Sequence, residues 1–315
     1  MKRAPPGVLV RRLNRRRIGV IQGGSSSERR ISILTGRAVA RALRSWGLRA
    51  RAIEARGNLE ERLRKHGIDL AVLAVHGSPG EDGTLQGLLE ILGIPYTGSG
   101  VYASALAINK PAAKALFDRE GIPTPRWAEV GRNGRLTERE WRRIGRPWVV
   151  KPSRQGSALG VTIVRRAAGR ARALSKAWSF GGPALVEEYV PGTEITVGVL
   201  GSEALPVVEI VPAHGFYDYH SKYARGGSRH VVPARIPEAV RRRAQRIARR
   251  AFEVLRCRGY GRVDAIVGRD GIPRVLEVNT IPGMTSVSLL PDAARAAGIP
   301  FNELVLRVIE SSAVL

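Results

Sequence analysis

In the first hundred residues, short apolar segments alternate with segments whose apolar residues recur at helical spacing. Residues 18–21 and 69–75 are strongly apolar, and each is followed by a glycine-containing turn. Between them, residues 29–43 place apolar side chains three or four positions apart, which is typical of a helix with one buried face. Strands that alternate with helices form parallel sheets with both faces covered. The sequence therefore predicts an α/β fold that begins with a parallel sheet.

From Asn109 onward the pattern changes to pairs of apolar segments separated by glycine-containing turns. Residues 147–164 and 183–200 read as strand, break and strand. Residues 259–280 predict a hairpin, because an Arg-Asp-Gly turn separates two apolar segments. Residues 213–232 show little periodicity, and a loop of that length is usually functional or disordered. We expect a lid loop there.

Composition excludes several classes of protein. The chain has 315 residues, of which 43% are hydrophobic, so it is long enough for two or three domains with proper cores. Its single cysteine, Cys257, excludes an internal disulfide and suits a cytoplasmic location. No apolar run reaches the length of a membrane span, so we expect no membrane insertion. The basic segment 1–16 has too short an apolar part for a signal peptide, and we expect a disordered arm.

The formal net charge of +25 raises the possibility of a polyanionic partner. However, the arginines are spread along the chain and lack the interleaved aromatic residues that stack on bases. We therefore expect no specific nucleic-acid partner. A non-catalytic polyanion-binding protein remains an alternative of a different class.

The segment LEVNTIPGMTS combines an acid, an amide and a tight turn. Glu277 and Asn279 are two residues apart, so on a strand they point to the same face. Polar residues at a strand end can simply face solvent. Asp264, however, lies on the other strand of the predicted hairpin, where paired side chains are about 5 Å apart. Two carboxylates and an amide around one point suit Mg²⁺, which prefers oxygen ligands.

Two further segments have residue types suited to a nucleotide. In VVKPSRQGSALGV, Lys151 precedes a glycine loop whose backbone N–H groups can cradle phosphate. The spacing is not that of a Walker A loop, and a plain hairpin is an equal alternative. In VEEYVPGTEITV, Glu187 and Glu194 flank a Pro-Gly break, where acids can contact an adenine amine or ribose hydroxyls. An ordinary charged strand edge is the alternative.

Eight motifs in one order resemble the D-alanine–D-alanine ligase family of the ATP-grasp superfamily. They are GGSSSERRIS, VHGSPGEDGTLQGLLE, PYTGSG, NK at 109–110, VKPSRQGSALGV, FYDYHSKY, GRVDAIV and EVNTIPGMTSVSLLP. The resemblance extends from about residue 17 to 311 and leaves out the basic arm.

This resemblance implies an ATP-grasp fold of three α/β domains, with ATP between the central and C-terminal domains. The implied boundaries are 17–108, 109–190 and 191–315. The implied reaction is ATP-dependent ligation of two D-alanines through an acyl phosphate, for peptidoglycan precursor synthesis. The resemblance also implies a homodimer and two Mg²⁺ ions, with Mn²⁺ as an alternative ion.

For ATP, the resemblance implies phosphate contacts from lysines, adenine contacts from a hinge and a ribose contact from an acid. The phosphate-binding lysines are Lys110, Lys151 and Lys222, the hinge is Glu187, Tyr189 and Val190, and the ribose acid is Glu194. Ser157 is a further implied ATP-binding residue. The implied metal ligands are Asp264, Glu277 and Asn279.

For D-alanine, the resemblance implies that Glu28 fixes the first ammonium, with His76 beside it. Ser157 and Tyr223 would complete a hydrogen-bonded set with Glu28 that closes the loop. The remaining implied residues stabilise the oxyanion or hold the second carboxylate, and they are Arg262, Gly283, Ser288 and Leu289.

The sequence departs from the family pattern in the glycine loop. Ala158 stands where the family commonly has a second serine, and Gln155 replaces a frequent acid. The nearest enzymatic alternative is a D-alanine–D-lactate ligase or another ATP-grasp carboxylate–amine ligase. Lys222 and Tyr223 favour the peptide-forming activity, because depsipeptide-forming relatives typically alter that loop.

Overall fold

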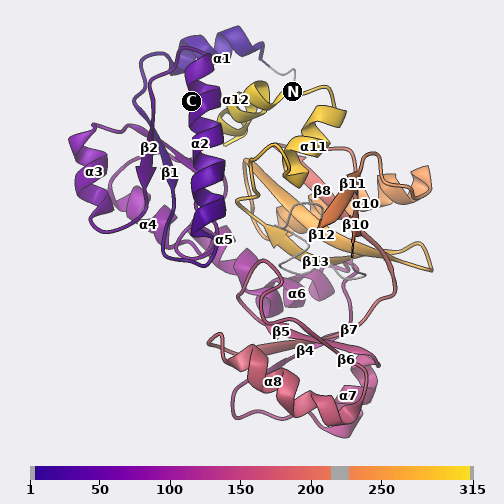
Figure 1. Ribbon diagram of the computed structural model, residues 1–315. Helices are drawn as coiled ribbons and strands as arrows, with labels where there is room; N and C mark the ends of the chain where they lie inside the picture. Colours follow the sequence, from indigo (N-terminus) through magenta and orange to yellow (C-terminus); the bar gives the residue numbers. More distant parts are fainter. Residues whose placement is uncertain (1–3, 214–226, 313–315) are drawn as a thin grey trace.

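The computed structural model describes residues 4–213 and 227–312 of the chain. In these residues three β-sheets follow one another along the sequence, each with helices of its own (Figure 1). The α/β fold predicted from the alternating pattern is confirmed.

The first sheet is parallel and three-stranded, in the order β2-β1-β3. Its central strand is buried because helices cover the sheet, as the apolar sequence of residues 18–21 predicts. Tyr96 adds an isolated parallel bridge to Ala71. The elements are β1 (Ile18–Gln22), α2 (Arg29–Ser45), β2 (Ala50–Glu54), α3 (Leu59–Lys65), β3 (Leu70–Leu73), α4 (Thr84–Ile91) and α5 (Val101–Ile108).

The second sheet is antiparallel, in the order β4-β7-β5-β6. A glycine-rich turn joins β5 to β6, and in it Ser157 and Ala158 adopt positive φ angles of 55°. The elements are α6 (Lys110–Arg119), β4 (Trp127–Val130), α7 (Glu138–Ile144), β5 (Trp148–Pro152), β6 (Thr162–Val164), the 3-10 turn η1 (Ala167–Gly169), α8 (Arg170–Trp178) and β7 (Ala184–Glu188).

The third sheet runs in the order β11-β10-β8-β12-β13, with the short strand β9 paired to β8. The predicted hairpin of residues 259–280 is β12 and β13, and Asp264 is the cross-strand partner of Glu277. The elements are β8 (Gly192–Leu200), β9 (Glu203–Ala204), β10 (Val208–Pro212), β11 (Ser228–Val231), α10 (Glu238–Val254), β12 (Tyr260–Gly268), β13 (Pro273–Asn279), α11 (Leu289–Ala296) and α12 (Phe301–Ser311).

The loop expected over residues 213–232 is shorter than predicted. Its last part forms β11, which pairs with β10 from Glu209↔Val231 to Pro212↔Ser228. The rest of the predicted lid, with Lys222 and Tyr223, lies outside the described residues.

The expectation of a disordered arm over residues 1–16 is wrong for α1 (Pro6–Leu13). Leu9 and Leu13 are fully buried, in a core cluster that also contains residues of α2, α11 and α12. In Figure 1, α1 lies against α12, and α12 lies beside α2. The helix forms because its leucines are one turn apart and Pro6 suits a first helical position. The C-terminal helices therefore bind the first sheet's layer to the third sheet.

Candidate active site

We call each sheet together with its helices a unit, numbered in the order of the sheets. Two adjoining cavities lie between these units. The larger, of about 1400 Å³, is bounded by α2, the glycine loop after β5, the end of β13 and the start of α11. The smaller, of about 440 Å³, lies between the second and third sheets. Lys110 and Glu277 line both cavities, and Lys110 Nζ is 3.3 Å from a Glu277 carboxylate oxygen. A group bound in one cavity would therefore meet a group bound in the other at this pair.

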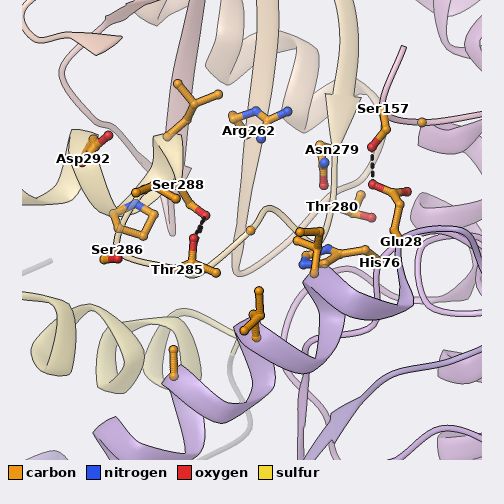
Figure 2. A pocket seen from close by; sticks show the side chains of 18 of the residues that line it. Glu28, His76, Ser157, Arg262, Asn279, Thr280, Thr285, Ser286, Ser288 and Asp292 are labelled. Atoms are coloured by element: carbon orange, nitrogen blue, oxygen red, sulfur yellow. Dashed lines mark hydrogen bonds between the residues drawn. The ribbon is translucent and has the colours of Figure 1, made fainter. Parts of the chain in front are cut away.

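Glu28 and Ser157 meet at one end of the larger cavity. Glu28 is the residue before α2, and Ser157 comes from the glycine loop of the second sheet. The Ser157 hydroxyl donates a hydrogen bond to the Glu28 carboxylate (Figure 2). Both side chains are buried, so this bond joins the first unit to the second. Ser157 lines the larger cavity, with Glu28, although ATP contact was predicted for it.

His76 fixes the turn that follows β13. One ring nitrogen is 3.0 Å from the Thr35 hydroxyl, and Nδ1 is 3.0 Å from the Ile281 carbonyl oxygen. The Thr35 hydroxyl also accepts a hydrogen bond of 3.4 Å from the backbone N–H of Met284. The residues on both sides of Gly283 are therefore tied to the first unit. His76 lies in the wall of the larger cavity, which Glu28 also lines.

Glu81 stands behind His76, 3.6 Å from its Nδ1. Burial raises the pKa of the Glu81 carboxyl, the His76 hydrogen bond opposes that shift, and the Glu28 charge adds to it. Sequence reasoning missed both Thr35 and Glu81. Thr35 is seven residues after Glu28, which is two helical turns. This spacing could have predicted that the two residues lie on the same side of α2.

The other end of the larger cavity is built from the turn before α11. Ser288 precedes that helix, and its hydroxyl is 2.8 Å from the Thr285 hydroxyl and accepts from the Thr285 N–H at 3.0 Å. A Cβ at Gly283 would lie 2.9 Å from the Ser288 hydroxyl, so a larger residue there would displace this hydroxyl. Leu289 opens the helix, where backbone N–H groups favour an anion. Figure 2 shows Ser288 and Glu28 at opposite ends of the cavity.

Arg262 lies between the two ends, on β12. Its guanidinium makes two hydrogen bonds of 2.8 Å to the Asp264 carboxylate. The Thr196 hydroxyl donates a third bond, of 2.6 Å, to Asp264. Arg262 lines the cavity, and a guanidinium there can stabilise negative charge on a bound group.

Asp264, Glu277 and Asn279 form an all-oxygen set along the hairpin. Two carboxylates on paired strands repel unless positive charge lies nearby, and Arg262 supplies it for Asp264 and Lys110 for Glu277. Asn279 is the cross-strand partner of Arg262, and its side-chain oxygen Oδ1 accepts a hydrogen bond from the Ile281 N–H at 2.9 Å. In the described part of the chain, no three His, Cys, Asp or Glu side chains form a metal cluster. The site thus comprises two carboxylates and an amide, a donor set that fits a hard cation.

The smaller cavity brings together the residues expected to contact a nucleotide. Lys110, Lys151, the hinge residues Glu187, Tyr189 and Val190, and Glu194 all line it. Apolar side chains such as Ile210, Ile266 and Leu276 form its walls. The predicted Lys222 lies outside the described residues.

Two lysines hold the Glu187 carboxylate. Lys151 pairs with one oxygen, and Lys114 Nζ is 2.5 Å from the other. Burial by itself would raise the pKa of Glu187, but the two lysines outweigh it and hold that pKa below its ordinary value. Sequence reasoning missed Lys114, although it follows Lys110 by four residues and so shares its helix face.

Known proteins resemble this chain over nearly its whole length. The family descriptions "D-ala D-ala ligase N-terminus" and "D-ala D-ala ligase C-terminus" match residues 48–99 and 116–310. The D-alanine–D-alanine ligase of Pelotomaculum thermopropionicum is 48% identical over 304 residues, which cover 93% of this chain and 96% of that protein. The chain belongs to the D-alanine–D-alanine ligase family. The ligase of Citrifermentans bemidjiense, with 44% identity, covers 97% of this chain and 99% of its own length.

Solved structures of this ligase family have the same fold. The Bacillus anthracis D-alanine–D-alanine ligase complexed with ATP has a TM-score of 0.84 and 37% identity, covering 94% of this chain and 97% of that one. A second structure of the Bacillus anthracis ligase has a TM-score of 0.85 and 39% identity, with the same coverage. The predicted family and ATP-grasp fold are confirmed, and the enzyme class is that of an ATP-dependent ligase. Among the described helices, none is long and apolar enough to cross a membrane.

Proposed function

We propose that the protein joins two D-alanines to D-alanyl-D-alanine with ATP, as a step in the synthesis of peptidoglycan precursors. The observation that carries this proposal is the Lys110–Glu277 pair, which lines both cavities. A nucleotide in the smaller cavity would direct its phosphates to this pair. An amino-acid carboxylate in the larger cavity would reach it from the other side.

In the proposed mechanism, Glu28 binds the ammonium of the first D-alanine, and Ser157 holds the Glu28 carboxylate in place. The carboxylate of that D-alanine takes the γ-phosphoryl group of ATP, which gives an acyl phosphate and ADP. Lys110 and Lys151 offset the repulsion between the carboxylate and the phosphates.

The second D-alanine binds at the other end, with its carboxylate at Ser288 and the backbone of Leu289. Its free amine attacks the acyl carbon, and a tetrahedral intermediate forms. Arg262 and the Gly283 N–H stabilise the oxyanion, and His76 and Thr35 hold the turn that carries Gly283. The C–O bond to phosphate then breaks, the amine proton is lost and the dipeptide forms.

Asp264, Glu277 and Asn279 are the residues that would hold Mg²⁺. Their oxygen-only donor set supports this, as does their place beside both cavities. Two ions, with Mn²⁺ as an alternative, would supply positive charge that neutralises the transferred phosphoryl group.

Several finer statements belong to the same proposal. We infer three domains with boundaries at 17–108, 109–190 and 191–315, a homodimeric assembly and a cytoplasmic location. The family resemblance and the single cysteine support them. Sedimentation of the purified protein would test the dimer.

The test is phosphate release with ATP and D-alanine, repeated with equal D-alanine and D-lactate and products separated by mass. The proposal predicts D-alanyl-D-alanine as the dominant product near pH 8. A dominant depsipeptide would favour the D-alanine–D-lactate alternative. No phosphate release from folded protein would favour the non-catalytic polyanion-binding alternative.

A further inference from the structure

Lys114 is a fully buried charged residue to which the mechanism above gives no role. It lies on α6, one turn after Lys110, and its relative exposure is 0%. An ammonium in the protein interior is costly unless it is paired and hydrogen-bonded. Lys114 is both, because its Nζ lies beside the Glu187 carboxylate and donates to the Thr124 hydroxyl.

Lys114 and Lys151 hold Glu187 from different sides. Lys151 lines the nucleotide cavity, whereas Lys114 stands behind Glu187 and outside the cavity lining. Burial lowers the pKa of Lys114, and the Glu187 carboxylate opposes that shift. Glu187 thus has two cationic partners, of which only Lys151 lines the cavity.

The two lysines respond differently when a nucleotide binds. Lys151 faces the cavity, so a phosphate group competes with Glu187 for it. Lys114 has no access to the cavity and remains on Glu187. A buried carboxylate that lost its last cationic partner would take up a proton and change from acceptor to donor.

We propose that Lys114 sets the nucleobase selectivity of the cavity by acting through Glu187. It keeps Glu187 an ionised, acceptor-only group, which suits the exocyclic amine of a 6-aminopurine and repels the carbonyl oxygen of a 6-oxopurine. This inference rests on the proposed function, in which the smaller cavity binds ATP. Lys114 is a positioning residue, since it touches Glu187 and not the nucleotide.

The same lysine also fixes the hinge to the third sheet. The Thr124 hydroxyl that accepts from Lys114 donates to the Val275 carbonyl oxygen at 2.8 Å. Val275 is on β13, two residues before Glu277. A merely structural role for Lys114 would act through this connection and would not change the choice of base.

The experiment compares ATP with GTP in D-alanine-dependent phosphate release, with kcat and KM measured for each nucleotide. The variants are Lys114→Met, the double variant Lys114→Met/Glu187→Gln, and the control Thr124→Val. The control removes the connection to β13 but leaves the Lys114–Glu187 pair. Thermal unfolding is measured for every variant.

For Lys114→Met, we expect the ATP KM to rise more than kcat falls, and the ATP-over-GTP preference in kcat/KM to drop about tenfold. The double variant replaces the Glu187 carboxylate that would otherwise lose its Lys114 partner, so it should unfold at a higher temperature than Lys114→Met. Its carboxamide can rotate to offer either a donor or an acceptor, so the preference should stay low. Thr124→Val should lower the unfolding temperature and keep the wild-type preference.

An unchanged preference in Lys114→Met would overturn the inference. If that variant does not fold, an unchanged preference in the double variant would overturn it instead. A wild-type protein that releases no phosphate with ATP and D-alanine would contradict the proposed function itself, which separates the two failures.

Discussion

Lys110 Nζ lies 3.3 Å from the Glu277 carboxylate, where the two cavities of the molecule join. The two residues come from different units, since Lys110 begins α6 and Glu277 is on β13. Lys110 also donates a 2.7 Å hydrogen bond to the Gln155 carbonyl in the glycine loop. The helix, the loop and the strand thus converge where the phosphoryl group would be transferred.

Changing Glu277→Gln should lower ligation by at least about a thousandfold and leave the protein folded. The change removes an anionic metal ligand next to the phosphates. Glu253→Gln, an identical change at an exposed position on α10, is the matched control. Turnover near the wild-type value at saturating Mg²⁺ would contradict the metal assignment.

Ser157→Ala should raise the KM for the first D-alanine about three- to tenfold, because one hydrogen bond that orients Glu28 is lost. Ser153→Ala is the control. Ser153 is buried near the same loop, but its hydroxyl has no partner among the described residues. Initial rates at varied D-alanine measure the effect, and equal KM changes in both variants would argue against the Glu28–Ser157 contact.

Leu13→Ala should lower the free energy of unfolding by about 2–5 kcal/mol, since it leaves a cavity between α1 and the core. Arg12→Ala, at an exposed position of the same helix, should change it by less than about 0.5 kcal/mol. Urea unfolding of both variants measures the difference. Equal stability of the two would mean that the N-terminal helix is not docked.

Cys257 should resist alkylation in the folded protein. Burial raises the pKa of its thiol to about 12, with a weaker opposing effect of Ser99. Raising a thiol pKa lowers the thiolate fraction at a given pH, to about one in ten thousand near pH 8. Iodoacetamide labelling followed by mass spectrometry should be slow until the protein is denatured. Equally fast labelling of the folded and the denatured protein would contradict this.

The local pattern of apolar and turn residues was sufficient to predict the strands that position the site residues. The hairpin of β12 and β13 followed from two apolar segments and an Arg-Asp-Gly turn, and its register pairs Asp264 with Glu277 as expected. The parallel first sheet followed from alternating periodicity. Both depend on residues close in sequence or on a strict period.

Contacts between distant segments were harder to predict. Lys114 has the charge and spacing of an ordinary solvent-facing lysine, and only the approach of β7 to α6 makes it a buried partner of Glu187. The helix α1 was missed because its few apolar residues gain stability only when α12 covers them. In each case the deciding free energy comes from tertiary packing, which the local sequence does not contain.

The most direct test of ligation through an acyl phosphate is the fate of the D-alanine carboxylate oxygens. The protein is incubated with ATP, Mg²⁺ and D-alanine labelled with ¹⁸O in its carboxylate, and the inorganic phosphate is analysed by mass spectrometry. The account predicts that one ¹⁸O appears in each phosphate released, with one D-alanyl-D-alanine formed alongside it. Unlabelled phosphate, or phosphate released without dipeptide, would contradict it.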